Sequence, residues 1–170
     1  QGCCIRDSTR FALPDQYAHK YQGHGGATNT QSMMSIQYEL DLFGKQSSDL
    51  QLTSGRRNDQ RDSNESCPNI VPTTLLIRDL GYITSTYLKA VIDKGAYFLN
   101  RLPSQMNLYD VKGEEIDLNK VYKKLKKNKV PFMELSVIAG KTAKIPCRLI
   151  VHIANEKTAR HRLKKTTKIT

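Results

Sequence analysis

Two aspartates, Asp7 and Asp79, each end a short apolar run, and each directly follows the dipeptide Ile-Arg. An apolar run of four to eight residues between turn signals is typical of a buried strand. Alternate residues of a strand share a face, so Asp7 shares a face with Ile5 and Asp79 with Ile77. Open α/β sheets bind ligands at the carboxyl ends of their strands, and the pattern predicts both carboxylates there.

If these two strands are neighbours in the sheet, the two carboxylates meet at one edge and can hold divalent metal. Mg²⁺ prefers one or two carboxylates together with phosphate oxygens and water. Two such ions about 3.5–4 Å apart can activate a water or hydroxyl and stabilise the leaving oxygen in phosphodiester chemistry. A single aspartate after a strand is more often a cap or turn residue, so the hypothesis depends on the pair.

The elements that would position the pair begin with three strands. Residues 3–7 form the first, and residues 33–42 alternate apolar and polar side chains, which predicts a strand with one side wet or lightly covered. A turn at residues 43–46 leads to a strand at 49–53, with Leu50 and Leu52 predicted to face inward. Together these segments predict an antiparallel hairpin.

The second half of the sheet is predicted from residues 58–102. A helix at 58–66 precedes the strand that carries Asp79, and a second helix runs from an N-cap at Thr84 to a stop at Gly95. Residues 96–102 form the next strand, which a right-handed βαβ connection makes parallel to the strand of Asp79. The fold class is therefore α/β, with a mixed sheet of an antiparallel meander plus parallel strands.

Composition limits the classes of protein that the chain can belong to. Of 170 residues 38% are hydrophobic, which favours a globular chain, and no apolar run approaches the 18 residues of a membrane span. The four cysteines form no C-x-x-C pair and are predicted to be buried reduced thiols. Residues 111–170 hold 16 Lys/Arg against 5 Asp/Glu, an excess of 11 that equals the net charge of the whole chain. This asymmetry suggests a polyanionic partner, although a solubilising face is the simpler alternative.

The change of character near residue 107 predicts a domain boundary. Residues 1–106 form the core that carries both aspartates, and residues 107–170 form a basic, β-rich subdomain. The second part is predicted to hold a lysine-rich helix around 118–125, strands at 132–138 and 145–154, and a basic segment from residue 155 onward.

The sequence resembles the catalytic domain of bacterial insertion-sequence transposases of the DDE class over nearly its whole length. Ile5-Arg6-Asp7-Ser8-Thr9 is similar to the first-aspartate motif of that family, and Ile77-Arg78-Asp79-Leu80-Gly81-Tyr82 to the second. Residues 96–101 resemble the next strand, whose closing arginine, Arg101 here, approaches DNA in the family. The resemblance is strongest to the cut-and-paste group with a β-rich insertion before the glutamate. It implies a ribonuclease H-like fold, with Asp7 and Asp79 as catalytic residues that bind two Mg²⁺ or Mn²⁺ ions.

One part of the family pattern is missing from these 170 residues. The family glutamate lies in Tyr-x-x-Arg-x-x-x-Glu-x-x-x-x-x-x-Lys, and no tyrosine here has an arginine three residues later. Glu134 and Glu156 lie in the expected insertion and are poor substitutes, so this chain contains no third acid. We therefore expect a fragment of a longer protein that is inactive alone, with its insertion incomplete. Intact, it would hydrolyse DNA at transposon ends and transfer strands to target DNA, as a cytoplasmic, nucleoid-associated homodimer.

The remaining candidate residues concern DNA. The residues predicted to bind DNA phosphates are basic: Arg101, Lys157, Arg160, Arg162, Lys164 and Lys165. Arg6 and Arg78 point away from their aspartates on the pleat, so packing is a more natural role for them than catalysis. Two alternatives stay open: a non-catalytic nucleic-acid-binding module on a degenerate ribonuclease H-like fold, or another Mg²⁺-dependent nuclease with its third acid inside the chain.

Overall fold

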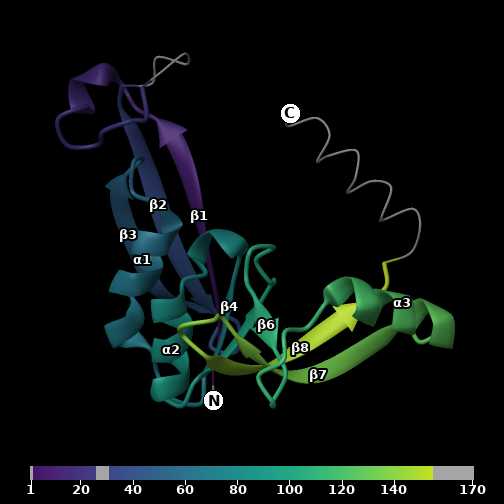
Figure 1. Ribbon diagram of the computed structural model, residues 1–170. Helices are drawn as coiled ribbons and strands as arrows, with labels where there is room; N and C mark the ends of the chain where they lie inside the picture. The colour runs from purple at the N-terminus through teal and green to yellow at the C-terminus, as the bar shows by residue number, and fades with distance from the viewer. Residues whose placement is uncertain (1, 26–30, 155–170) are drawn as a thin grey trace. The chain divides into compact units, whose positions relative to one another are not determined.

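The structure is a computed structural model that describes residues 2–25 and 31–154 (Figure 1). The chain divides into two compact units, Gln1–Gln105 and Met106–Thr170. The basic segment predicted from residue 155 onward lies outside the described residues.

A five-stranded mixed sheet with the order β3-β2-β1-β4-β5 forms the centre of the first unit. Strands β1, β2 and β3 pair antiparallel, whereas β4 pairs parallel to β1 and β5 parallel to β4. This confirms the predicted mixed α/β sheet, a meander followed by parallel strands. The strands are β1 (Cys3–Ala12), β2 (Met33–Asp41), β3 (Gln46–Ser54), β4 (Leu75–Arg78) and β5 (Tyr97–Asn100).

The first strand is longer than predicted. The sequence predicts a strand over residues 3–7 only, but β1 continues to Ala12 and pairs with β2 as far as Ala12↔Met33. The hydrogen-bonded ladder with β2 keeps this polar stretch extended, because each strand supplies the backbone partners of the other. A short 3-10 turn, η1 (Asp15–Tyr17), follows.

The two helices of this unit begin and end near the predicted positions. Helix α1 (Asp59–Glu65) starts where the Asn58 Oδ1 accepts a hydrogen bond from the Arg61 amide at 2.8 Å. Helix α2 (Ser85–Asp93) is capped by the Thr84 Oγ1, which accepts from the Tyr87 amide at 3.0 Å. Just beyond its end, Gly95 adopts a φ of 67°, a left-handed conformation that glycine takes without a steric penalty. Both helices lie on one side of the sheet (Figure 1).

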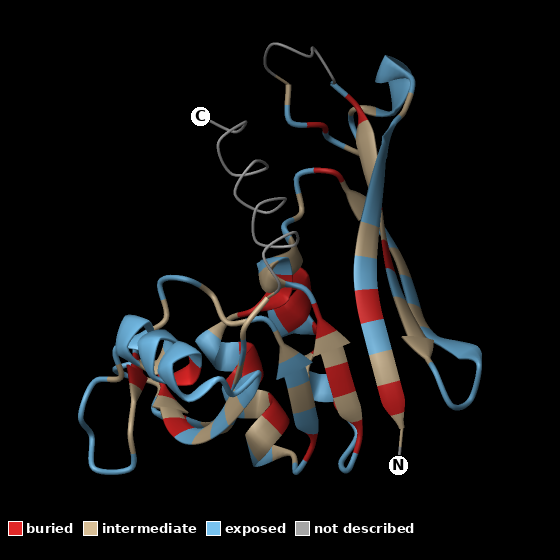
Figure 2. Cartoon of the chain, turned by 90° about the vertical axis from the view of Figure 1, so that its right-hand side faces the viewer, coloured by how far each residue is buried: buried red, intermediate tan, exposed pale blue. Residues whose placement is uncertain are grey.

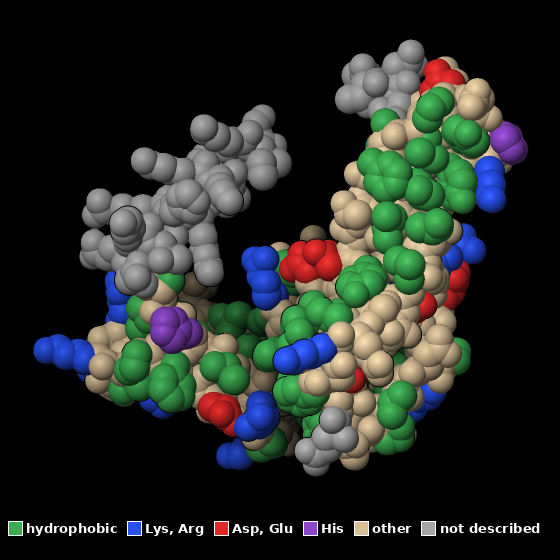
Figure 3. Space-filling view, turned by 180° about the vertical axis from the view of Figure 1, so that it is seen from behind, with side chains coloured by type: hydrophobic (Ala, Val, Ile, Leu, Met, Phe, Trp, Pro, Cys, Tyr) green, Lys and Arg blue, Asp and Glu red, His purple; other side chains and the backbone are tan. Residues whose placement is uncertain are grey.

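The prediction of which hairpin side faces the core was wrong. Ser35 and Gln37 on β2 are fully buried, whereas Leu50 and Leu52 on β3 are 60% and 54% exposed. Figure 2 shows how buried and exposed positions alternate along the strands. The helix-covered side is polar because α1 brings Asp62, itself 1% exposed, to charged partners on the sheet. The apolar side is open, and hydrophobic side chains gather along the hairpin in Figure 3.

Buried apolar side chains nevertheless anchor the helices and the parallel strands. The central ones are Leu76, Tyr82, Tyr87, Leu88 and Val91, none of them more than 4% exposed. A further 3-10 turn, η3 (Cys67–Asn69), links α1 to β4, and another, η4 (Leu80–Tyr82), follows Asp79 directly.

Up to residue 154, the second unit is described as a three-stranded antiparallel sheet with one helix. Its strands β6 (Leu108–Tyr109), β7 (Phe132–Ala139) and β8 (Ile145–His152) are arranged in that order, and α3 (Leu118–Asn128) connects the first two. Leu125 from the helix is fully buried, and Val137 and Ile145 are each 2% exposed. Asp117 caps α3 by accepting from the Asn119 amide at 2.8 Å. None of the helices in the described residues is long and apolar enough to cross a membrane.

Candidate active site

Asp7 lies within β1 and Asp79 directly follows β4, so only Asp79 stands at the strand end where both aspartates were predicted. The pairing of β1 with β4 is in register at Arg6↔Arg78, so the two aspartates come next on both strands. Adjacent strands lie about 4.8 Å apart, so Asp7 and Asp79 are neighbours across the strand pair. Both side chains line one cavity of about 420 Å³, together with Ile5, Arg6, Ile77, Arg78, Leu99, Asn100 and Arg101. The proximity expected from the sequence is therefore present in the fold.

Both aspartates are open to solvent. The Asp7 Oδ1 accepts a hydrogen bond from the Ser8 amide at 2.8 Å, which orients one carboxylate oxygen. Asp79 makes no side-chain capping bond to the turn that follows it. The Arg101 Nη1 lies 3.8 Å from the Asp79 Oδ1, and the two side chains are 75% and 66% exposed. An exposed ion pair of this kind contributes little stability, so both groups are available for ligands.

The donor chemistry of the pair fits a hard divalent cation. Two carboxylates supply oxygen ligands, and the open cavity leaves room for the water or phosphate oxygens that complete the coordination of Mg²⁺ or Mn²⁺. Within the described residues, no group of three or more His, Cys, Asp or Glu side chains is placed to hold a metal.

A buried network of charges, which the sequence reading missed, holds the two strands from the opposite face. The Arg6 Nε and Nη2 donate to the two oxygens of Asp62 at 2.6 and 3.1 Å, and its Nη1 donates to Asp49 at 2.8 Å. Burial alone would lower the pKa of Arg6, but the hydrogen bonds to Asp62 and Asp49 outweigh it and raise that pKa. Arg6 is therefore a buried, permanently charged side chain on the helix-covered side of β1.

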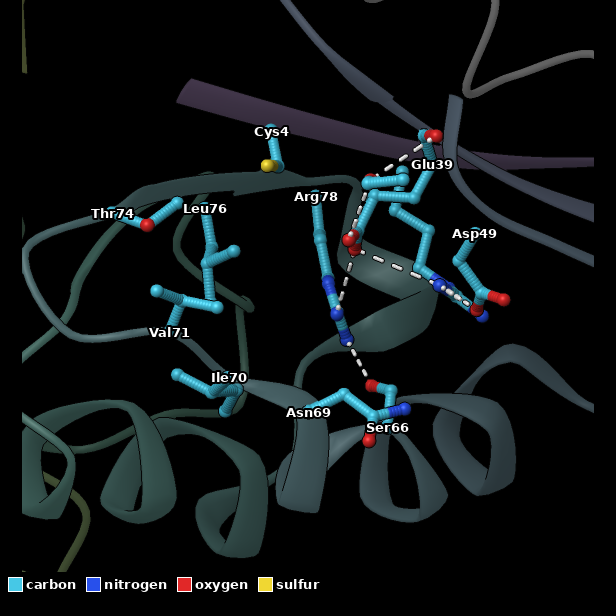
Figure 4. A pocket seen from close by; sticks show the side chains of 12 residues that line it. Cys4, Glu39, Asp49, Ser66, Asn69, Ile70, Val71, Thr74, Leu76 and Arg78 are labelled. Carbon is cyan, nitrogen blue, oxygen red and sulfur yellow. Dashed lines mark hydrogen bonds and ion pairs between the residues drawn. The ribbon is translucent and has the colours of Figure 1, made fainter. Parts of the chain in front are cut away.

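Arg78 is held in the same way under β4. Its Nη2 donates to the Glu39 Oε2 at 3.2 Å, and its Nη1 donates to the hydroxyls of Ser63 and Ser66, both at 3.0 Å. The guanidinium also lies over the Tyr87 ring, 4.4 Å from its centroid. Figure 4 shows Arg78 reaching Glu39 and Ser66 beside a cavity of about 240 Å³. The sequence signal for this network is an arginine in each of two otherwise apolar strands, because a buried charge needs partners.

A second cluster holds the part of β1 that follows Asp7. The Asp59 Oδ1 accepts from the Ser8 hydroxyl at 3.0 Å, from the Gln37 Nε2 at 3.1 Å and from the Arg10 Nη2 at 3.2 Å. The Tyr82 hydroxyl donates to the Gln37 Oε1 at 2.6 Å. Asp59 thus ties the segment after Asp7 to β2 and, through Gln37, to the turn after Asp79.

The predicted DNA-binding residues are only partly described. Arg101 lies beside Asp79 at the cavity, whereas Lys157, Arg160, Arg162, Lys164 and Lys165 lie outside the described residues. Helix α3 carries no acidic residue. Its lysines and the one that follows are all exposed: Lys120, Lys123, Lys124, Lys126, Lys127 and Lys129.

Comparisons with known proteins give one family. The Transposase DDE domain family matches residues 1–164. The transposase for insertion sequence element IS231E of Bacillus thuringiensis subsp. finitimus is 31% identical over 178 residues, covering 95% of this chain and 37% of that protein. The IS231B transposase of Bacillus thuringiensis subsp. berliner is 30% identical over 177 residues with the same coverage, and the IS1151 transposase of Clostridium perfringens is 26% identical over 163.

These relatives are much longer than the chain, which spans 37% of the length of the IS231E and IS231B transposases. Among solved structures, a chain of the simian T-cell lymphotropic virus intasome in complex with PP2A regulatory subunit B56 gamma aligns with a TM-score of 0.39 and 13% identity. That alignment covers 75% of this chain and 42% of the other, and it is too distant to carry an argument.

Proposed function

This chain belongs to the transposases with a DDE domain, and on that premise we propose that Asp7 and Asp79 are two of its three catalytic acids. The observation that carries the proposal is the parallel register Arg6↔Arg78, which sets the two aspartates at the same level of neighbouring strands, Asp7 within β1 and Asp79 just after β4. The shared cavity gives a phosphodiester access to both. The order β3-β2-β1-β4-β5 is the arrangement expected of a ribonuclease H-like core, which is the fold that we propose.

In this proposal the protein side chains hold and orient the reacting groups. Bound Mg²⁺ or Mn²⁺, two ions in the intact protein, would supply Lewis acidity toward water and phosphoryl oxygens. Asp7, oriented by the Ser8 amide, and Asp79, just after the neighbouring strand, would fix the position of the bound metal ions. Arg101 is free enough to leave Asp79 and bind a DNA phosphate, because their 3.8 Å pair is exposed.

The third acid and the full reaction belong to the longer protein in this proposal. The relatives extend well beyond the matched region, and the family glutamate pattern is absent from these residues. We propose that the glutamate is supplied outside residues 1–170, on a helix that packs on the sheet. The open apolar side of the sheet, with Leu50, Leu52 and Leu99 all more than half exposed, supports this assignment. The chain alone would then bind metal weakly and not complete strand transfer.

The partners in this proposal are transposon-end DNA and target DNA, bound by a homodimer. Support for DNA as the partner comes from the net charge of +11 and from the row of exposed lysines on α3. Such contacts give affinity for the DNA backbone without reading its sequence.

The test is divalent-ion binding by this chain, with Mn²⁺ as a paramagnetic probe. In ¹⁵N spectra we expect Mn²⁺ to broaden the amides of Ser8 and Leu80, each next to one acid, at sub-millimolar to millimolar concentration. Asp7→Asn or Asp79→Asn should abolish the joint broadening, whereas Asp93→Asn removes an equally exposed carboxylate elsewhere and should not. Joint broadening that survives both substitutions, or its absence in the native chain, would refute the proposal. Mg²⁺-independent DNA binding unaffected by them would then favour the non-catalytic module.

A further inference from the structure

One residue before the two aspartates, at the level of Arg6 and Arg78, a row of polar side chains crosses all five strands of the sheet. The register pairs Asp49 with Glu39, Glu39 with Arg6, Arg6 with Arg78, and Arg78 with Asn100. We call these five residues the polar row. Because the pleat alternates, Arg6 and Arg78 face the helix-covered side while the following Asp7 and Asp79 face the open side.

Glu39 is the member of the polar row that binds both arginines. Its Oε2 lies 3.2 Å from the Arg78 Nη2 and 3.6 Å from the Arg6 Nη1. Asp49 instead binds Arg6 and accepts from the Gln51 Nε2 at 2.9 Å. At the far end, the Asn100 Nδ2 donates to the Arg78 carbonyl at 2.6 Å, tying β5 to the last residue of β4.

The electrostatics make the Glu39 carboxylate the critical member. The side chains of Arg6 and Arg78 are 1% and 2% exposed and project from adjacent strands, so their positive charges repel at low local dielectric. Arg6 has Asp62 and Asp49 as further anionic partners. The other partners of Arg78 are neutral, namely two serine hydroxyls and the rings of Tyr82 and Tyr87. Loss of the Glu39 charge would leave Arg78 as a buried cation beside another cation.

We propose that Glu39 is a positioning residue for the acid pair. By binding both arginines from one carboxylate, it holds β1 and β4 together one residue before Asp7 and Asp79. Its contribution to metal binding rests on the function proposed above, whereas its effect on the pairing of β1 with β4 does not. When the hydrogen bonds or ion pairs that orient metal-binding side chains are lost, the metal affinity typically falls 10–100-fold.

The experiment compares Glu39→Gln with Asp49→Asn, which removes a carboxylate of the same row that does not bind Arg78. Native-state hydrogen exchange should show faster opening of the β4 amides in Glu39→Gln, with the β2–β3 amides less affected. Asp49→Asn should leave β4 protection close to that of the native chain. The Mn²⁺ affinity measured from the Ser8 and Leu80 amides should fall about tenfold in Glu39→Gln and less than about twofold in Asp49→Asn.

The outcomes separate the two proposals. If the native chain shows no joint Mn²⁺ broadening, the proposed function fails while hydrogen exchange still decides the role of Glu39. Equal β4 exchange in Glu39→Gln and Asp49→Asn would overturn the positioning role. If Glu39→Gln does not fold, Glu39→Asp keeps the charge but is one methylene shorter and cannot span both arginines. That variant should fold and still show loosened β4 amides, and native-like β4 protection in it would also overturn the proposal.

Discussion

Arg6 and Asp62 form a two-point ion pair with almost no exposure to solvent, with N···O distances of 2.6 and 3.1 Å. The side chains are 1% and 0% exposed, and the pair joins the first strand to a helix 56 residues later in the chain. The helix-covered side of this sheet is thus held by buried charge as much as by apolar packing.

Removal of the Asp62 carboxylate should destabilise the first unit strongly. Asp62→Ala leaves the buried Arg6 without its main partner, and breaking a buried pair in this way typically costs about 3–5 kcal/mol. Glu65→Ala, on the same helix but 48% exposed, should cost less than about 1 kcal/mol despite its bonds to Arg57 and Arg61. Urea unfolding followed by circular dichroism measures both. Similar losses in the two variants would contradict the dominance of the buried pair.

The open side of the hairpin should tolerate polar substitution. Leu52 is 54% exposed on β3, so Leu52→Thr, which keeps a strand-favouring residue, should change the free energy of unfolding by less than about 1 kcal/mol. Leu88→Ala, at a position 4% exposed on α2, should cost about 2–5 kcal/mol because it leaves a cavity. The same urea titration compares them. A large loss for Leu52→Thr would show that this side is covered in solution.

The elements that sequence predicted well are those specified by local signals. Thr84 and Gly95 bracket α2 because a side-chain cap and a left-handed glycine act within one helical turn. The parallel pairing of β4 with β5 follows from the handedness of βαβ connections, which needs no knowledge of distant contacts. That Asp7 and Asp79 lie on neighbouring strands was only a condition of the hypothesis, because β1 pairs with β4 through a long-range contact that no local signal specifies. The catalytic role of the two acids stays a prediction.

The hairpin orientation could not be read in the same way. Alternation shows that the two sides of β2 differ, but it does not say which side a helix will cover. Here the polar side is covered, because Gln37 meets Asp59 and Tyr82, and Arg6 meets Asp62. Those partners lie 22 to 56 residues away in sequence, so no local pattern identifies them.

Two buried tyrosines should make the protein sensitive to alkali. Burial raises the pKa of Tyr82 and of Tyr87 to about 12, against an ordinary value of about 10. Because the folded pKa is the higher one, their stabilising contribution is complete below about pH 10 and is lost as the pH rises toward 12. Absorbance at 295 nm should show a late tyrosinate step that coincides with loss of structure. Tyr87→Phe should reduce that step, whereas Tyr97→Phe, at a position 62% exposed, should leave it unchanged.

Binding to double-stranded DNA should be salt-dependent and should weaken when the α3 lysines are neutralised. Each phosphate contact contributes about 0.9 to the slope of log affinity against log salt, since binding releases condensed counterions. Replacing Lys123, Lys124 and Lys127 with glutamine should lower that slope by about one to three, equally for unrelated sequences. The matched control replaces Lys45, Lys89 and Lys94 of the first unit, which removes the same charge from elsewhere. Fluorescence anisotropy at several salt concentrations gives the slopes. If both triple variants lower the slope equally, α3 is a solvated face and not a DNA-binding surface, and the affinity arises from net charge alone.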